Sequence, residues 1–516
     1  MSLRSLISEK LIMPVLLRFS DCPPWPWYQE LLRLDRADRD EIQRCQWDKF
    51  RSLVEYAQRE VPYYTEIFGE VDICAEDLTT WDDLLAMPTI NKRQIAANFP
   101  DRITSMKSDR DSWEYIATSG TTDRLMVIKD SEAKSRNIAL SLYEEHMQGT
   151  YAPGSLHVDV PPDACSLACA AKVNRSKGPL GRAKKTIADL TALGTFRMPR
   201  FITGQIFRNI ASPMKEMPSF GPEGTRVSSE MLQWYVERIR QWQPVVLSGL
   251  PTYLQLLGRH IERIGELPPS IGGLLPQGAL STPSLKNELR RVFGVPVHEV
   301  YGGHEFGCGA STCQKQGRLH IMMSGCLVET VRNGKHVGPG ELGEIVVTTF
   351  INRAMPLIRY RPGDVGRLYN DYCSCGRQTQ LLTVEGRMED TIITSKGIRT
   401  EREIIDFLMD WPNVEFGQLV QRNERRCDLL VVEKDRGKTN LNDLAEAMKG
   451  FLGDEIEVRP RLVSTIKPEV SGKFRFVKSI SYERFHESMP VMEPLRNELS
   501  VHMEDSTNEP QGTKMP

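Results

Sequence analysis

The sequence predicts an α/β fold with a large N-terminal part and a small α+β unit near its C-terminal end. Between residues 114 and 350, short apolar runs alternate with helical patterns, which is typical of a sheet flanked by helices. After Gly386 the pattern changes to short strands and two amphipathic helices within about a hundred residues, a normal domain size. We therefore expect two domains.

Hydrophobic periodicity and turn residues predict the individual elements. An N-terminal helical stretch spans 27–70 and breaks at Val61-Pro62, because the residue before a proline avoids helical geometry. In the large part, we expect strands at 115–117, 245–248, 274–279, 297–301 and 342–349, and helices at 251–264 and 283–293. In the small unit, we expect strands at 391–394, 417–421, 428–433 and 456–459, and helices at 402–409 and 441–451.

The pattern changes near Gly386. We therefore expect an N-terminal domain over residues 1–388 and a C-terminal domain over 389–485. Residues 486–516 are polar and lack apolar periodicity, which predicts a disordered tail.

Composition and charge argue against several classes of protein. The 516-residue chain is 40% hydrophobic and 26% charged, as globular proteins are, and its formal net charge is −2. Neither half is strongly basic, so we expect no nucleic acid or membrane partner. No apolar run reaches the length of a membrane span, and the N-terminus lacks a signal-peptide cleavage site.

The cysteines indicate the compartment. There are eleven, an odd number, and most are scattered in a chain without a secretory signal. This favours free thiols in a reducing cytoplasm. The sequence does not fix the oligomeric state and leaves a homodimer open.

A hydroxyl-rich loop and a distant lysine suggest ATP chemistry. The loop is a run of five small residues: Thr118, Ser119, Gly120, Thr121 and Thr122. Its backbone N–H groups and hydroxyls can wrap phosphate oxygens, and Lys473, in a Ser-Gly-Lys turn, can add a positive charge. The loop alone is weak evidence, because such turns are common. An ordinary P-loop is absent from the sequence.

Three further blocks follow the loop in chain order. Residues 301–305 read Tyr-Gly-Gly-His-Glu, 360–364 read Tyr-Arg-Pro-Gly-Asp, and 386–390 read Gly-Arg-Met-Glu-Asp. The aromatic ring of the first block can stack on a purine, and its acid can hold Mg²⁺ beside phosphates. The acid of the second block suits ribose hydroxyls. Each block alone is also an ordinary strand end, but the ordered series is much more specific.

Taken in order, these blocks resemble those of the adenylate-forming superfamily of acyl-CoA ligases, adenylation domains and luciferases. More narrowly, the chain is similar to the phenylacetate–coenzyme A ligase branch over residues 27–480. Segments at 61–64, 87–92, 278–279 and 356–360 support that branch. The resemblance implies a large adenylate-forming domain of mixed sheets with a β-rich subdomain, followed by a mobile lid domain.

The resemblance also implies roles for individual residues. The nucleotide-binding set would be residues 118–122, Gly278, Ala279, Tyr301, Gly302 and Asp364. Glu305 would bind Mg²⁺, and Arg387 would contact the nucleotide near a hinge at Glu389. Lys473 would be the catalytic lysine of the adenylation step. A lysine ~4 Å from the bridging oxygens contributes about 4 kcal/mol at an effective dielectric constant of ~20.

The implied activity is that of an AMP-forming acid–thiol ligase. It would activate an aromatic or hydrophobic carboxylic acid with ATP to an acyl-adenylate, then transfer the acyl group to coenzyme A. An adenylating ligase with an amine or a carrier-protein thiol as acceptor remains an alternative. So does a non-catalytic adenylate-binding homologue, because Asp123, Arg124, His304 and Pro362 depart from the family pattern.

A second group of residues predicts a metal site. Cys313, His320, Cys373 and Cys375 offer three thiolates and an imidazole, which suit tetrahedral Zn²⁺. The spacing is not that of a common zinc finger, so a set of free thiols is the alternative. Members of the resembled branch carry such residues at matching places, which favours a structural zinc.

Overall fold

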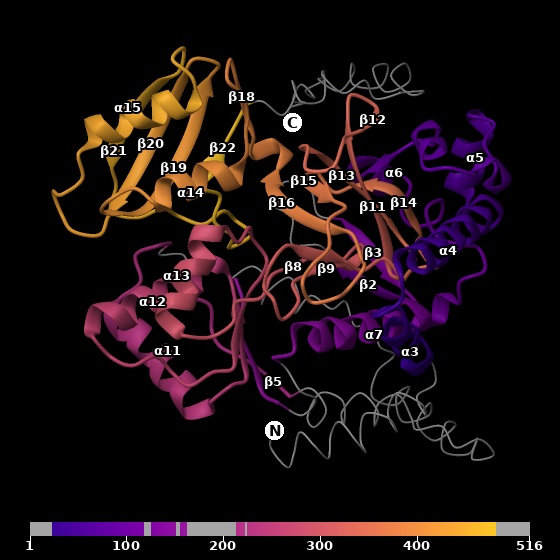
Figure 1. The fold of residues 1–516 in the computed structure, drawn as a ribbon, viewed down its shortest axis with the longest axis horizontal. Coiled ribbons are helices and arrows are strands. Elements are labelled where there is room, and N and C mark those ends of the chain that lie inside the picture. Colours follow the sequence, from indigo (N-terminus) through magenta and orange to yellow (C-terminus); the bar gives the residue numbers. More distant parts are fainter. Residues whose placement is uncertain (1–22, 118–124, 151–154, 163–212, 222–223, 481–516) are drawn as a thin grey trace, which may run out of the picture.

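The computed structural model describes residues 23–117, 125–150, 155–162, 213–221 and 224–480. It has a mixed α/β architecture, with a large part and a smaller C-terminal unit drawn in orange to yellow in Figure 1. The predicted fold class is confirmed. The hydroxyl loop at 118–122 and the predicted tail at 486–516 lie outside the described residues.

Three helices, α3 (Trp25–Leu34), α4 (Arg39–Glu60) and α5 (Pro62–Glu70), form the N-terminal layer. The break at Val61-Pro62 is confirmed. A second break, before Arg39, was not predicted. Here the Asp38 side chain caps α4 by accepting a hydrogen bond from the Glu41 N–H at 2.7 Å.

A four-stranded parallel sheet has the strand order β5-β4-β6-β7. Its strands are β4 (His157–Val160), β5 (Met214–Glu216), β6 (Val246–Gly249) and β7 (Gly273–Pro276). Its helices are α11 (Ser229–Trp242), α12 (Pro251–Ile264) and α13 (Pro283–Phe293). One face of the sheet packs against these helices through a shared apolar core that includes Val158, Leu247 and Leu274.

A ten-stranded, mainly antiparallel sheet forms the β-rich part, with β8, β9, β10, β16 and β15 as consecutive neighbours. Its strands are β1 (Ile90–Asn91), β8 (Val300–Gly303), β9 (Gly307–Ser311), β10 (Leu319–Ile321), β11 (Cys326–Arg332), β12 (Lys335–His336), β13 (Gly343–Thr349), β14 (Leu357–Arg361), β15 (Asp364–Tyr369) and β16 (Leu381–Arg387). The strand expected at 297–301 differs from the prediction. Val297 makes one parallel bridge to Leu274, whereas β8 starts at Val300 and joins the large sheet.

Outside the C-terminal unit, the other elements that the structure describes are a hairpin, two helices and four short 3₁₀ turns. They are β2 (Glu114–Ala117), β3 (Met126–Lys129), α6 (Lys92–Ala97), α7 (Ser131–Gln148), η2 (Ala75–Asp77), η3 (Asp82–Ala86), η4 (Arg110–Ser112) and η6 (Met388–Asp390). β2 and β3 pair from Glu114–Lys129 to Ala117–Met126, so they flank the chain segment that contains the hydroxyl loop.

The C-terminal unit is a four-stranded sheet, ordered β21-β20-β19-β22, with two helices and a small hairpin. Its elements are β17 (Ile392–Thr394), β18 (Gly397–Arg399), α14 (Glu401–Met409), β19 (Val414–Asn423), β20 (Arg426–Glu433), α15 (Leu441–Leu452), β21 (Glu457–Leu462) and β22 (Val477–Lys478). The unit has its own apolar core, to which Leu419, Leu429 and Leu444 belong. The boundary at Glu389 and the mobility of the unit stay predictions.

Among the described helices, each is too short or too polar to cross a membrane.

Candidate functional site

Three of the sequence blocks meet at the ends of neighbouring strands. Asp364 opens β15, and it lies opposite Arg387, the last residue of β16. The Asp364 carboxylate accepts a hydrogen bond from the Tyr301 hydroxyl at 2.9 Å and one from Arg387 Nη1 at 2.7 Å. The negative charge of Asp364 raises the pKa of Arg387, so this guanidinium stays a cation. The three side chains form one polar cluster, defined here as the Asp364 cluster.

Glu305 lies close by, beyond the end of β8. Its carboxylate is buried and accepts a hydrogen bond from the Tyr360 hydroxyl at 3.2 Å. Burial, the charge of Glu305 and this hydrogen bond raise the pKa of Tyr360, because each disfavours the phenolate. Tyr360 therefore acts as a donor that fixes the Glu305 carboxylate.

Lys473 reaches this region from the C-terminal unit. The space where a Cβ atom of Gly278 would stand lies 4.0 Å from Lys473 Cε and 3.3 Å from Leu250 Cδ2. Gly278 also has a φ of +82°, in the region that favours glycine. The structure therefore brings Lys473 to the turn after β7, and its catalytic role stays a prediction.

The charges of Lys129 and Lys473 both act on His304. Burial lowers the pKa of His304, and the charges of Lys129 and Lys473 lower it further, whereas Glu305 opposes them. Neutral His304 thus lies within the field of two lysines and one acid.

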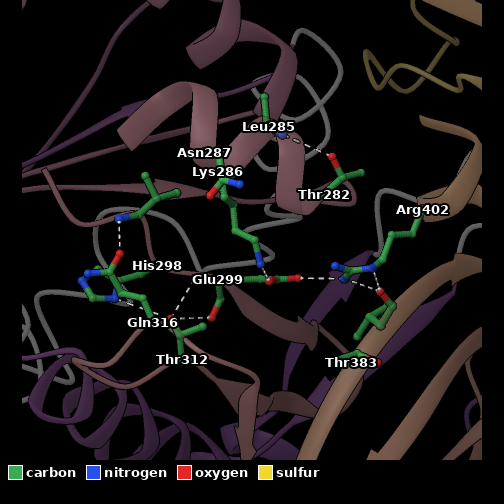
Figure 2. Close-up of polar contacts among 12 residues, drawn as sticks. Thr282, Leu285, Lys286, Asn287, His298, Glu299, Thr312, Gln316, Thr383 and Arg402 are labelled. Carbon is green, nitrogen blue, oxygen red and sulfur yellow. Dashed lines mark hydrogen bonds and ion pairs between the residues drawn. The ribbon is translucent and has the colours of Figure 1, made fainter. Parts of the chain in front are cut away.

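A network of ion pairs joins the C-terminal unit to the large part at the carboxylate of Glu299 (Figure 2). Figure 2 shows Lys286 of α13 and Arg402 of α14 approaching this carboxylate from opposite sides. Lys286 Nζ lies 2.5 Å from Glu299 Oε2, and Arg402 Nη2 lies 3.6 Å from Oε1. Arg402 Nε also lies 3.6 Å from Glu385 Oε2. We call these four residues the Glu299 network.

Further contacts hold α14 and β19 against the same helices. The Ser284 N–H, in the first turn of α13, donates to Asp406 Oδ1 at 3.0 Å. Arg259 of α12 donates to the Glu415 carbonyl, and Phe416 is buried in the core that α12 shares. These contacts fix the orientation in which Lys473 lies beside Gly278.

The predicted hinge residue Glu389 lies in the 3₁₀ turn η6. Its carbonyl accepts a hydrogen bond from Arg475 Nη2 at 3.3 Å, and Arg475 also lies 2.5 Å from the buried Asp390 carboxylate. The turn thus contacts the segment that carries Lys473. Whether Glu389 acts as a hinge stays a prediction.

The four predicted metal ligands come together at one place. The potential ligand atoms of Cys313, His320, Cys373 and Cys375 all lie within 4.8 Å of one another. Sγ of Cys313 lies 3.7 Å from Sγ of Cys373, and Sγ of Cys375 lies 3.5 Å from Nε2 of His320. Tetrahedral zinc, with Zn–S ≈ 2.3 Å and Zn–N ≈ 2.0 Å, would separate its ligand atoms by about 3.5–3.8 Å. The cluster fits zinc in ligand type and in size.

A second set of contacts orients the cluster. Thr379 Oγ1 lies 2.8 Å from His320 Nδ1, which leaves Nε2 directed at the thiols. Burial lowers the pKa of His320 to about 4, so the ring is neutral, as a metal ligand must be. Two strand pairings, β9–β10 and β10–β16, bring the segments together.

Comparisons with known proteins agree with the fold. This chain is 23% identical over 455 residues to a phenylacetate-coenzyme A ligase of Thermus thermophilus, covering 86% of this chain and 91% of the relative. It is 23% identical over 458 residues to Protein CapK of Staphylococcus aureus, covering 87% and 91%. A solved structure of 2-hydroxyisobutyryl-CoA ligase, in the postadenylation state with an acyl-AMP, matches with a TM-score of 0.67 at 16% identity, covering 88% of this chain and 93% of that chain. The chain has the fold of the adenylate-forming ligases.

The resemblance inferred from the motifs is thereby confirmed. No family model matches the chain. The same ligase with its acyl-AMP and CoA, in the thioesterification state, matches with a lower TM-score of 0.54 at 17% identity, covering 84% of this chain and 88% of that chain.

Two cations near the site were not predicted as functional. Lys129 ends β3 opposite Glu114, and burial lowers its pKa to about 8 against the charge of Glu305. Lys92 begins α6, where burial and the charge of Arg387 lower its pKa. The signal available in the sequence for Lys129 was its place on the strand that follows the hydroxyl loop.

For several predicted residues, the contacts in the structure do not indicate a role. Gly302 would meet the Gly307 carbonyl at 2.5 Å with any Cβ atom, so its backbone must approach β9 closely. Ala279 is exposed next to Gly278. The hydroxyl loop, Asp123 and Arg124 lie outside the described residues. Pro362 retains a polar contact, since its carbonyl accepts from Arg387 Nη1 at 3.2 Å.

Proposed function

We propose that this protein uses ATP to convert a carboxylic acid to an acyl-adenylate and then transfers the acyl group to coenzyme A. The observation that carries the proposal is the position of Lys473 beside Gly278, where the charges of Lys473 and Glu305 both act on His304. The names of the relatives, phenylacetate-coenzyme A ligases, support the same reaction.

In the first step, a carboxylate oxygen attacks the α-phosphorus of ATP, and the bond to the bridging oxygen breaks to release pyrophosphate. Both reactants are anions, so positioning and electrostatic stabilisation dominate the barrier. Lys473 would stabilise the charge at the α-phosphate, and Lys129 would add a second ammonium near Glu305. Asp364 would accept from ribose hydroxyls while Tyr301 and Arg387 hold it.

In the second step, the thiolate of CoA attacks the acyl carbon, AMP leaves, and the thiol proton passes to solvent. Lys473 is then no longer required, and the incoming thiol needs access to the acyl carbon. A swing of the C-terminal unit would supply that access, and it would have to break the Arg402–Glu299 pair.

Two metal ions belong to the proposal. Glu305 offers the hard oxygen ligand that Mg²⁺ prefers, and the ion would neutralise phosphate charge when bound. Cys313, His320, Cys373 and Cys375 would hold a structural zinc ion that ties β9 and β10 to the loop before β16. The cytoplasmic location is also a proposal, supported by the free thiols of the eight described cysteines.

The proposal is tested by pyrophosphate release from ATP with a broad panel of carboxylic acids, aromatic acids included. Acceptors are then compared by product mass: CoA, amines and a carrier-protein thiol. The expected result is acid-dependent pyrophosphate followed by an acyl-CoA. Bound ATP without pyrophosphate for any acid would instead indicate a non-catalytic adenylate-binding protein. An amide or an acylated carrier as the main product would show that the acceptor is an amine or a carrier-protein thiol and not CoA.

A further inference from the structure

The parallel sheet changes its direction of winding between β4 and β6. The strand that follows β4 in sequence, β5, lies on one side of it, and the next strand, β6, lies on the other. In open parallel sheets, ligands bind outside the carboxyl ends of the strands at such a switch point. This end of β4 and β6 is therefore a place to look for a binding site.

A polar network occupies that place. Asp159 of β4 and Ser248 of β6 are register partners, and the Ser248 hydroxyl donates to Asp159 Oδ1. Gln277 Nε2, just after β7, donates to the same oxygen at 3.0 Å. His157 Nε2 lies 2.8 Å from Ser248 Oγ. Because Ser248 gives its only hydrogen to Asp159, the imidazole must be the donor in this last contact.

The Ser248 hydroxyl and the Gln277 amide donate directly to Asp159, and His157 acts on it through Ser248. Asp159 is 9% exposed and Ser248 is fully buried. Among the residues that the structure describes, the side-chain hydrogen bonds to the Asp159 carboxylate both reach Oδ1. A carboxylate has acceptor sites on both of its oxygens. Oδ2 thus has capacity for a donor from a ligand.

The network lies next to the proposed reaction centre. Gln277 directly precedes Gly278, beside which Lys473 lies, and its N–H donates to the Gly249 carbonyl at 2.9 Å. The acid substrate must place its carboxylate near Lys473 in the proposed reaction. Its other end can then reach the carboxyl ends of β4 and β6.

We propose that Asp159 binds a hydrogen-bond-donating group, a hydroxyl or an ammonium, on the carboxylic acid substrate. Ser248 and Gln277 position the Asp159 carboxylate for this contact. The inference rests on the proposed function and narrows it. The acid can still have an aromatic or hydrophobic frame, but it carries a donor. An acid without a donor cannot bond Oδ2 of Asp159, and sites built to bind a substrate hydroxyl or amine discriminate strongly against such analogues.

The test measures kcat/KM for pyrophosphate release by the full-length protein with matched acids. Each hydroxyl- or amino-substituted arylcarboxylic acid is paired with its methyl-substituted isostere, with the substituent moved around the frame. The wild-type protein is expected to prefer at least one donor acid over its methyl partner by at least tenfold. Asp159→Leu is expected to reverse that preference, and its turnover of the methyl acid shows that the variant is folded.

Asp159→Asn keeps the shape and removes the charge, so it provides a readout if the leucine variant does not fold. It is expected to lose preference for an ammonium and to retain preference for a hydroxyl. Asp428→Asn, in the C-terminal unit, is the matched control and should leave every ratio unchanged. Equal or better use of methyl or unsubstituted acids by the wild type would overturn this inference and leave the proposed function standing. No pyrophosphate with any acid would overturn both.

Discussion

Arg402 of the C-terminal unit lies 3.6 Å from Glu299 of the large part, and both side chains are largely buried. Glu299 keeps a closer partner in Lys286, at 2.5 Å. Loss of Arg402 would therefore weaken the attachment of α14 without leaving Glu299 alone. This pair is a contact that the proposed swing between the two half-reactions must break.

Replacing Arg402 by methionine should slow acyl-adenylate formation about tenfold, equivalent to ~1.4 kcal/mol. The orientation that places Lys473 beside Gly278 then loses one of its contacts. Thioester formation from a supplied acyl-adenylate should not slow. Arg422→Met, which removes a pair with Asp428 inside the C-terminal unit, is the control. Equal slowing of both steps by Arg402→Met would refute a role for this pair in orientation.

Gly278→Ala should impair adenylation beyond its effect on stability. The new methyl group would meet Leu250 Cδ2 at 3.3 Å and stand 4.0 Å from Lys473 Cε, at a φ of +82°. Gly265→Ala provides a matched control, because Gly265 has a φ of +68° and nothing within 4 Å of its new Cβ atom. Both variants should lose about 1 kcal/mol of unfolding free energy from backbone strain. Only Gly278→Ala should also lose pyrophosphate release, and similar activities for the two would contradict the crowding described here.

The lowered pKa of Lys129 predicts that the use of ATP depends on pH. Burial lowers the pKa of this lysine from 10.5 to about 8, so its ammonium is present below pH 8 and is lost above it. The kcat/KM for ATP should fall as the pH rises through about 8, since this quantity reports groups of the free enzyme. In Lys129→Arg the charge persists, and the fall should move to higher pH. A profile that is identical in the two proteins would exclude Lys129 as its source.

The same lysine makes a prediction for stability. The pKa of Lys129 is lower in the folded protein than in the unfolded chain, so the unfolded chain binds more protons between about pH 8 and 10.5. The contribution of Lys129 to the free energy of unfolding therefore rises with pH over that window. Below pH 8 the buried ammonium therefore costs stability, on the order of 1–3 kcal/mol. Lys129→Met should melt higher than the wild type at pH 7, and this difference should shrink toward pH 10.

Purified protein should contain one equivalent of zinc, measured by elemental analysis. Cys375→Ser should lower both the zinc content and the melting temperature, because structural zinc binding is worth on the order of 10 kcal/mol. Cys74→Ser removes a thiol outside the cluster, which donates to Asp77 Oδ2 at 2.9 Å, and it should change neither. Less than half an equivalent of zinc in the wild type would instead favour a cluster of free thiols.

Local signals predicted helix bounds well where a proline begins the helix and a glycine follows its end. Helices α12 and α13 begin at prolines and end before Gly265 and Gly294, which adopt positive φ, so their bounds could be read from the sequence. The strand at 297–301 could not be assigned to a sheet, because its partners are chosen by packing and not by composition. Val297 bridges to Leu274, whereas Val300 pairs with Ser311.

The candidate site was predictable where local sequence motifs mark its residues. Motif order led to Tyr301, Glu305 and Asp364, and the structure brings Tyr301 and Asp364 into contact. The spacing of the cysteines and histidine led to a cluster that the structure assembles. Arg402 and Glu299 are 103 positions apart and carry no motif, so only the folded chain shows that they meet. The same holds for Asp159 and Ser248.

The central claim is that Lys473 serves the adenylation step alone, from the C-terminal unit. The most direct measurement compares Lys473→Ala with the wild type in two assays: pyrophosphate release from ATP with the acid, and thioester formation from the supplied acyl-adenylate and CoA. The first rate should fall at least 100-fold, as expected when a preorganised charge at the transition state is removed, while the second stays within about threefold. A comparable loss in both assays, or full adenylation without the lysine, would contradict the account.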